Sequence, residues 1–354
     1  MMQTSRLSIY GMVLAFMMLA ACSDDARTYR LGASSYEPTY IELSKALQAE
    51  LHLRGDVNLD IIETEGSVDS LKKLQAGKLD FALVQGGFIF DDTGLLSVAA
   101  VGTEYLHIIV PAASDIRDLS DLAGKRIATG VAGTGSRMIV EHIIEAARFD
   151  PQIQLFSTKN ESYHQQIIKD DTDAAVFVTD LRWDLGPELI KGSYRLVGVR
   201  SSDALAVRLM DMDSGITPQG VYGKNLSFPS TSIPTLTVRT HLLVRENIPD
   251  RIVTNLTETL FDYHVRRDAR LTELTEIDAR SGAKLSLHPA AENFYSRHEP
   301  ITSDEFEIAG VLLATLIASI GAINFLWEWY NARRQARIEK QLVETLHENG
   351  QNTS

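Results

Sequence analysis

The chain has 354 residues, of which 44% are apolar and 23% charged, and this ordinary composition excludes a wholly disordered chain, collagen and a polytopic membrane protein. Acidic residues outnumber basic ones 47 to 34, and a formal charge of -13 argues against nucleic acid as a partner, because its phosphates are also negative. The one cysteine, Cys22, allows neither an internal disulfide nor a zinc site built from cysteines. The length favours two domains.

Residues 1–21 have the pattern of a secretory signal peptide. Arg6 precedes an apolar run from Leu7 to Leu19, and this run is too short to cross a membrane comfortably. The only cysteine follows Leu19-Ala20-Ala21, which resembles a bacterial lipobox, in which the thiol becomes lipidated. We therefore expect a lipoprotein signal peptide over 1–21 and lipidation at Cys22. An ordinary signal peptide followed by a chance cysteine is the alternative.

A second apolar segment predicts a transmembrane helix over residues 308–328. Ile308 to Trp327 contains no charged residue, and at about 1.5 Å per residue it matches a hydrocarbon core about 30 Å thick. Acidic residues precede the segment, aromatic residues end it and basic residues follow it (Asp304, Glu305, Glu307; Trp327, Trp329, Tyr330; Arg333, Arg334, Arg337, Lys340). This bias places a tail, 329–354, in the cytoplasm and the body outside. A buried core helix is the alternative.

Between these segments the chain alternates strands and helices, which is typical of a doubly wound α/β fold. Strands are expected over 29–33, 57–63, 79–84, 95–101, 106–110, 124–129, 153–156, 173–178, 194–199 and 235–244. Helices are expected over 39–53, 67–76, 116–122, 133–147, 163–169, 185–191 and 249–263, with a long connection over 211–235. Two α/β lobes with a returning strand and helix fit a two-lobed binding fold. Lobe I would comprise 28–110 and 235–300, and lobe II 111–234.

One glycine-rich turn, Gly130 to Arg137, precedes an expected helix. It fails the P-loop pattern, since Ser136-Arg137 replaces Lys-Ser/Thr, and it fails the Rossmann pattern, since Met138 replaces the final glycine. Backbone N–H groups at such a helix start can bind an anion such as a carboxylate, although a plain helix cap is equally compatible. No catalytic or metal-binding pattern occurs elsewhere, so we expect neither an enzyme nor a cofactor.

The order of several motifs resembles the TAXI family, the solute-binding subunits of TRAP transporters. The segments that carry the resemblance lie between Tyr29 and Arg297: Thr64 to Gln85, Leu106 to Val110, Asp121 to Ile127 with the Gly133 to Ser136 turn, Ile233 to Thr235, and Leu287 to Tyr295. The resemblance implies a type II periplasmic-binding fold. It also implies a small carboxylate ligand, glutamate- or dicarboxylate-like, that is delivered to a polytopic TRAP membrane subunit.

The resemblance also implies a ligand site between the lobes. By position it comprises three residues of the first loop, two at the end of the third strand, three at the helix start and two after a later strand (Ser34, Ser35, Tyr36; Gln85, Gly86; Thr134, Gly135, Ser136; Thr179, Asp180). Two departures from the family pattern are Glu37, which brings negative charge next to the expected anion site, and Gly86-Gly87 after Gln85.

The ends of the chain and the resemblance together predict a protein of the bacterial inner membrane, attached through lipid and a membrane helix, with its main domain in the periplasm or extracytoplasmic space. A second class of function stays open. The same domain could sense a ligand, or act as a scaffold, and signal through the membrane helix.

Overall fold

The computed structural model describes residues 27–34, 36–55, 57–87, 93–148, 153–158, 172–182, 192–209, 211–222, 228–283, 285–299 and 303–351. The signal peptide, Cys22, Ser35 and the expected helices over 163–169 and 185–191 lie outside the described residues. The chain forms two compact units, Met1–Arg297 and His298–Ser354.

Within the first unit, lobe I is built on three parallel strands, β1 (Thr28–Ser34), β2 (Asn58–Thr64) and β3 (Phe81–Gln85), with β1 between the other two. Helix α2 (Pro38–Arg54) starts with a proline in its first turn and ends at Gly55 in the left-handed conformation. It shares a buried apolar core with α8 (Asp250–Leu260), α9 (Tyr263–Asp268) and α11 (Pro289–Ser296). Helix α3 (Ser67–Gln75) packs into a different apolar cluster.

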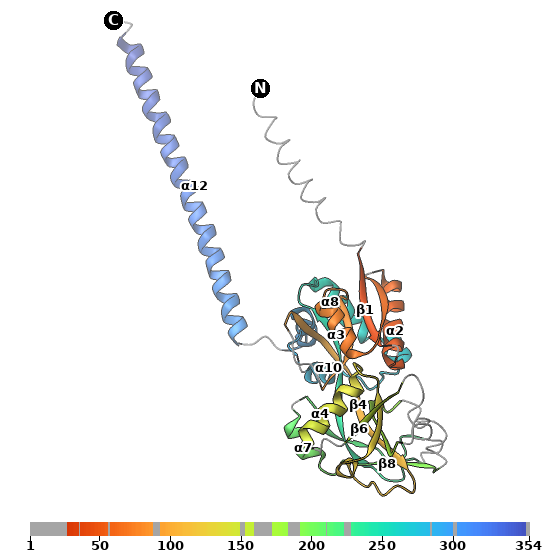
Figure 1. The fold of residues 1–354 in the computed structure, drawn as a ribbon. Coiled ribbons are helices and arrows are strands. Elements are labelled where there is room, and N and C mark those ends of the chain that lie inside the picture. The colour runs from red at the N-terminus through yellow and green to blue at the C-terminus, as the bar shows by residue number, and fades with distance from the viewer. Residues whose placement is uncertain are drawn as a thin grey trace. The chain divides into compact units, whose positions relative to one another are not determined.

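Lobe II is built on β5 (Arg126–Gly130), which pairs in parallel with β6 (Gln154–Thr158) and β7 (Ala174–Thr179). Helix α4 (Gly135–Ala147) buries Ile139, Val140 and Ile143 against these strands. The short helix α7 (Ser202–Arg208), the strand β8 (Tyr194–Val197) and the strand β9 (Asp213–Thr217) complete the lobe (Figure 1).

Two long antiparallel strands, β4 (Leu95–Pro111) and β10 (Ile233–Arg245), run through both lobes. On the lobe I side β10 pairs with β3, and on the lobe II side β4 pairs with β7 from Tyr105 to Ile109. The predicted two-lobed α/β fold is confirmed. The prediction of two separate strands over 95–101 and 106–110 was wrong, because Thr103 stays paired opposite Arg239 of β10 and keeps β4 continuous.

Three other expectations were wrong in detail. The helix expected over 116–122 is a 3₁₀ turn, Leu119–Leu122, capped by the side chain of Asp118. The helix expected over 249–263 ends at Leu260, because Asp262 caps the start of α9. The connection over 211–235 contains β9, which pairs with β10, and a further short helix, α10 (Glu276–Ser281), precedes α11.

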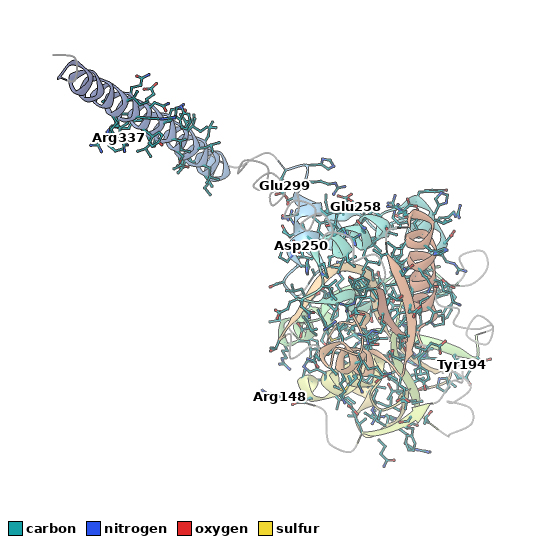
Figure 2. All side chains as sticks on the ribbon, turned by 90° about the horizontal axis from the view of Figure 1, so that it is seen from above. Arg148, Tyr194, Asp250, Glu258, Glu299 and Arg337 are labelled. Atoms are coloured by element: carbon teal, nitrogen blue, oxygen red, sulfur yellow. The ribbon has the colours of Figure 1, made fainter. Side chains whose placement is uncertain are left out.

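The second unit contains one long helix, α12 (Ser303–Gln351). Its segment Gly310–Ile338 is long and apolar enough to cross a membrane, and none of that segment is buried in the structure. Figure 2 shows its side chains projecting outward along the helix up to Arg337.

Candidate functional site

The end of β3 meets the start of α4, so lobe I touches lobe II at Gln85. The Gln85 side chain is buried, and its Nε2 donates to the carboxylate of Glu104 and, at 3.3 Å, to the carbonyl of Val178. A methyl group added at Gly135 would lie 2.1 Å from Gln85 Oε1. Glycine at position 135 is therefore what allows this side chain to fit against α4.

The turn that starts α4 is already in contact with protein groups. Ser136 Oγ donates to the carbonyl of Val178 at 2.9 Å, and Thr134 Oγ1 donates to the carbonyl of Val131 at 2.8 Å. Gly66, with a φ of 130°, lies so close that an added Cβ would be 3.1 Å from Thr134 Cα. The predicted anion-binding turn therefore lies at the lobe boundary and packs against lobe I. Its contact with a ligand stays a prediction.

The first loop and Gly86 make contacts within lobe I. Ser34 is buried at the end of β1, and its Oγ accepts from the backbone N–H of Tyr36 at 3.1 Å. The Tyr36 ring is exposed. The backbone N–H of Gly86 donates to the carbonyl of Arg239 at 2.7 Å, which ties the end of β3 to β10.

A buried carboxylate, Glu104, lies on β4 between the lobes. Its Oε1 accepts from the hydroxyl of Tyr40 at 2.6 Å and from Thr240 Oγ1 at 2.7 Å, and Gln85 donates to its other oxygen. Burial raises the pKa of Glu104 to about 7, and the nearby charge of Asp180 acts in the same direction.

A third carboxylate, Glu37, faces the same region. Burial raises its pKa well above the ordinary value, and the charges of Glu104 and Asp180 raise it further. Burial and mutual repulsion therefore favour the protonated forms of Glu37 and Glu104 where the lobes meet. The sequence places a carboxyl group at Glu37, and the structure adds Glu104, a residue that sequence analysis missed.

After β7 the chain links the lobes through Arg182. Asp180, 8% exposed, follows Thr179, and its carboxylate accepts from Arg182 Nε at 3.2 Å and from Arg182 Nη2 at 3.0 Å. Arg182 Nη1 donates across the boundary to the carbonyls of Ala269 at 2.7 Å and Arg270 at 3.0 Å. The ion pair therefore holds the guanidinium where it bonds the turn that follows α9 in lobe I.

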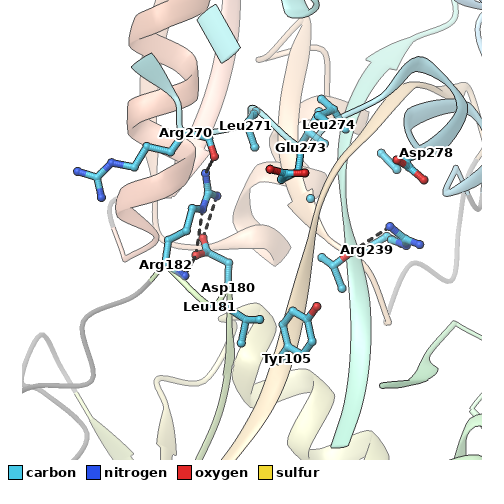
Figure 3. Close-up of a pocket in the computed structure, with 14 residues that line it drawn as sticks. Tyr105, Asp180, Leu181, Arg182, Arg239, Arg270, Leu271, Glu273, Leu274 and Asp278 are labelled. Atoms are coloured by element: carbon cyan, nitrogen blue, oxygen red, sulfur yellow. Dashed lines mark hydrogen bonds and ion pairs between the residues drawn. The ribbon is translucent and has the colours of Figure 1, made fainter. Parts of the chain in front are cut away.

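A cavity of about 430 Å³ lies beside β4, bounded by both lobes (Figure 3). Three arginines, three carboxylates, a tyrosine and three leucines account for most of its lining (Arg182, Arg239, Arg270; Asp180, Glu273, Asp278; Tyr105; Leu181, Leu271, Leu274). A much smaller cavity of about 20 Å³ adjoins Tyr40 and Glu104, and it shares Asp180 and Arg182 with the larger one. Asp180 and Arg182 thus line both spaces.

The structure brings Gln85, the turn 134–136 and Asp180 to the boundary between the lobes, but of the predicted residues that it describes only Asp180 lines the larger cavity. Sequence analysis missed Arg182, Arg239 and Glu273. Glu104 had a detectable signal, since it is a lone charge inside an apolar run, whereas the others depend on how distant loops meet. Within the described ranges, no group of three His, Cys, Asp or Glu side chains could hold a metal ion.

Comparison with known proteins gives one family and several remote structural similarities. The model of the NMT1-like family matches residues 33–297. XAC2383 from Xanthomonas citri, solved with ATP, is 14% identical over 77% of this chain and 95% of its own, with a TM-score of 0.46. A putative L-cystine ABC transporter protein from Listeria monocytogenes is 17% identical over 74% and 99%, with a TM-score of 0.45. The GluR0 ligand-binding core from Nostoc punctiforme, solved with L-glutamate, is 14% identical over 69% and 95%, with a TM-score of 0.43.

Proposed function

The chain belongs to the NMT1-like family, and we propose that it is a membrane-tethered, extracytoplasmic solute-binding subunit of a TRAP-type secondary transporter, of the TAXI type. It captures a small carboxylate-bearing solute between its lobes and delivers it to a polytopic membrane subunit. The TRAP assignment rests on the ordered motifs between Tyr29 and Arg297.

The observation that most supports solute capture is the cavity beside β4, because both lobes contribute to its walls. A cavity of about 430 Å³ falls in the range of small-molecule sites, about 300–1,000 Å³, and domain boundaries are common places for them. A solute that contacts both lobes stabilises their closed arrangement relative to an open one, because it gains contacts only when they close.

The two ends of the chain support the tether. The Gly310–Ile338 segment of α12 is long and apolar enough to span a membrane, and Arg333, Arg334 and Arg337 favour a cytoplasmic end. Lipidation at Cys22 would place a second anchor before β1. Two anchors would hold the domain near a membrane partner.

A second candidate function is a ligand sensor that signals through the membrane helix. It is favoured by the continuity of α12 from Ser303 to Gln351, because an unbroken helix joins the apolar segment to the basic tail. The two functions differ in their partner. A solute-binding subunit associates with a polytopic transporter protein, whereas a sensor associates with a signalling enzyme.

The experiment is a thermal-unfolding screen of the full chain in detergent with amino acids and dicarboxylates. A solute at 100 times its Kd should stabilise the folded domain by about 2.7 kcal/mol. Cross-linking in native membranes, followed by mass spectrometry, then identifies the partner. Stabilisation by a small carboxylate and a polytopic secondary transporter as the main cross-link support the proposal. A kinase or cyclase as the main cross-link contradicts it.

A further inference from the structure

The cavity beside β4 has charged groups of both signs on its walls, in equal numbers. Arg182 and Asp180 neutralise each other in an ion pair, with a distance of 3.0 Å between Nη2 and Oδ2. Of the other charged lining residues, Arg270 directs its guanidinium away from the labelled side chains (Figure 3), and Asp278 accepts from Thr275 Oγ1. Arg239 and Glu273 remain as one positive and one negative group, and a ligand that bonds to both has a negative and a positive end.

Arg239 offers the site for the negative end. It lies on β10 with its guanidinium oriented by one hydrogen bond, from Nη1 to Thr103 Oγ1 at 3.0 Å. Gly282 packs against the aliphatic part of the same side chain, since an added Cβ there would lie 3.5 Å from Arg239 Cδ. Burial raises the pKa of Tyr105, and the nearby positive charge of Arg239 opposes this rise. A fixed guanidinium with further N–H donors suits a carboxylate.

Glu273 offers the site for the positive end. It belongs to the turn between α9 and α10 and lines the cavity, and Figure 3 shows its carboxylate apart from the Arg239 guanidinium. Among the described residues, no hydrogen bond or ion pair joins the Glu273 side chain to a neighbour. Asp278, nearby, already accepts from Thr275 Oγ1 at 2.6 Å. Glu273 is therefore the carboxylate best placed to accept from an ammonium group.

We propose that this cavity binds a neutral, zwitterionic α-amino acid, with its carboxylate on Arg239, its ammonium group on Glu273 and its side chain against Leu181, Leu271 and Leu274. The assignment rests on the proposed function and narrows its solute class. A dicarboxylate fits less well, because its second carboxylate would lie among Asp180, Glu273 and Asp278. The acidic body also repels a net anion.

The experiment is isothermal titration of the full chain in detergent with four probes. L-Leucine has both charged groups, 4-methyl-2-oxopentanoate lacks the ammonium group, 3-methylbutan-1-amine lacks the carboxylate, and succinate is a dicarboxylate. We expect L-leucine to bind at least about tenfold more tightly than each of the other three, because each of them leaves one charged group of the cavity unmatched.

Two variants test the assigned contacts. Arg239→Gln should weaken L-leucine binding at least about tenfold. Glu273→Gln should weaken L-leucine but not 4-methyl-2-oxopentanoate, so that the preference between these two probes shrinks. Arg208→Gln and Glu258→Gln, exposed residues of the same types outside the cavity, should leave all four affinities unchanged.

Three results would overturn the inference. If succinate binds and L-leucine does not, the solute class is wrong while capture of a carboxylate stands. If L-leucine binds equally well to both cavity variants, the site is wrong. If none of the four probes binds while the thermal screen finds another carboxylate, the assignment to a neutral amino acid is wrong and the proposed function stands. If no solute in the screen stabilises the chain, the proposed function itself fails.

Discussion

Replacing Arg182 by alanine should favour the open arrangement of the two lobes. In the structure Arg182 Nη1 donates to the carbonyls of Ala269 and Arg270, and both acceptors belong to the opposite lobe. The Asp180 carboxylate fixes the guanidinium in this position. The variant removes both bonds across the boundary together with the ion pair to Asp180, and it leaves each lobe's own apolar core intact.

The magnitude follows from the number and exposure of these bonds. A hydrogen bond from a charged donor contributes about 1.5–3 kcal/mol when well buried. The Arg182 side chain is 29% exposed, so we take about 1 kcal/mol for each bond, or about 2 kcal/mol in total. That shifts the closed-to-open ratio about 30-fold. Since only the closed form contacts the solute from both lobes, the apparent Kd should rise by about 10- to 30-fold.

The assay is calorimetric titration of the stabilising solute into Arg182→Ala and into a matched control, Arg208→Ala. Arg208 also donates to a carbonyl, that of Ala146 at 3.3 Å, but inside one lobe. Arg182→Lys should be intermediate, because an ammonium group keeps the pair with Asp180 without the planar fork. An unchanged Kd in Arg182→Ala, or an equal loss in the control, would refute the role of these bonds.

Three further substitutions test the boundary and the core. Glu104→Gln should stabilise the domain at pH 8 and make its stability depend less on pH. The Glu104 carboxyl, whose pKa is raised, contributes stability that is complete below about pH 4.5 and is lost as pH rises through about 7. Melting temperatures from pH 4.5 to 8 measure this, and parallel curves for the wild type and the variant would contradict it. Gly135→Ala should cost about 1–3 kcal/mol in urea unfolding, because the methyl collides with Gln85, and a neutral result would mean that the side chain moves away freely. Asp80→Asn should lower the free energy of unfolding by about 3 kcal/mol, since this fully buried carboxylate pairs with three arginines whose charge would be left unmatched. Because the pKa of Asp80 is lowered, the wild type should lose this stability as pH falls below the ordinary range of aspartate, whereas the variant should not.

Sequence patterns predicted the central fold because its strands are short apolar runs with glycine or proline between them. Buried strands such as β3 and β7 have apolar residues almost throughout, and α3 ends before Gly77 as expected. The continuity of β4 could not be predicted, because Gly102 suggests a turn, and only pairing with β10 keeps this segment extended.

Local sequence does not predict which side chains line the candidate site. The carboxyl ends of the strands and the start of α4 could be located from turns and helix periodicity. Arg182, Arg239 and Glu273 lie in loops or at a strand position, and they meet only after β7, β10 and the turn following α9 are assembled. Local sequence does not contain that information.

If the two lobes close on a small solute, the distance between them should shorten when the solute binds. Spin labels at Leu53 on α2 and Val207 on α7, which are 80% and 83% exposed, report on the two lobes in a full-length Cys22→Ser background. We expect the stabilising solute to shift the distance distribution toward shorter values, and Arg182→Ala to require more solute for the same shift. A distribution that is identical with and without saturating solute would contradict it.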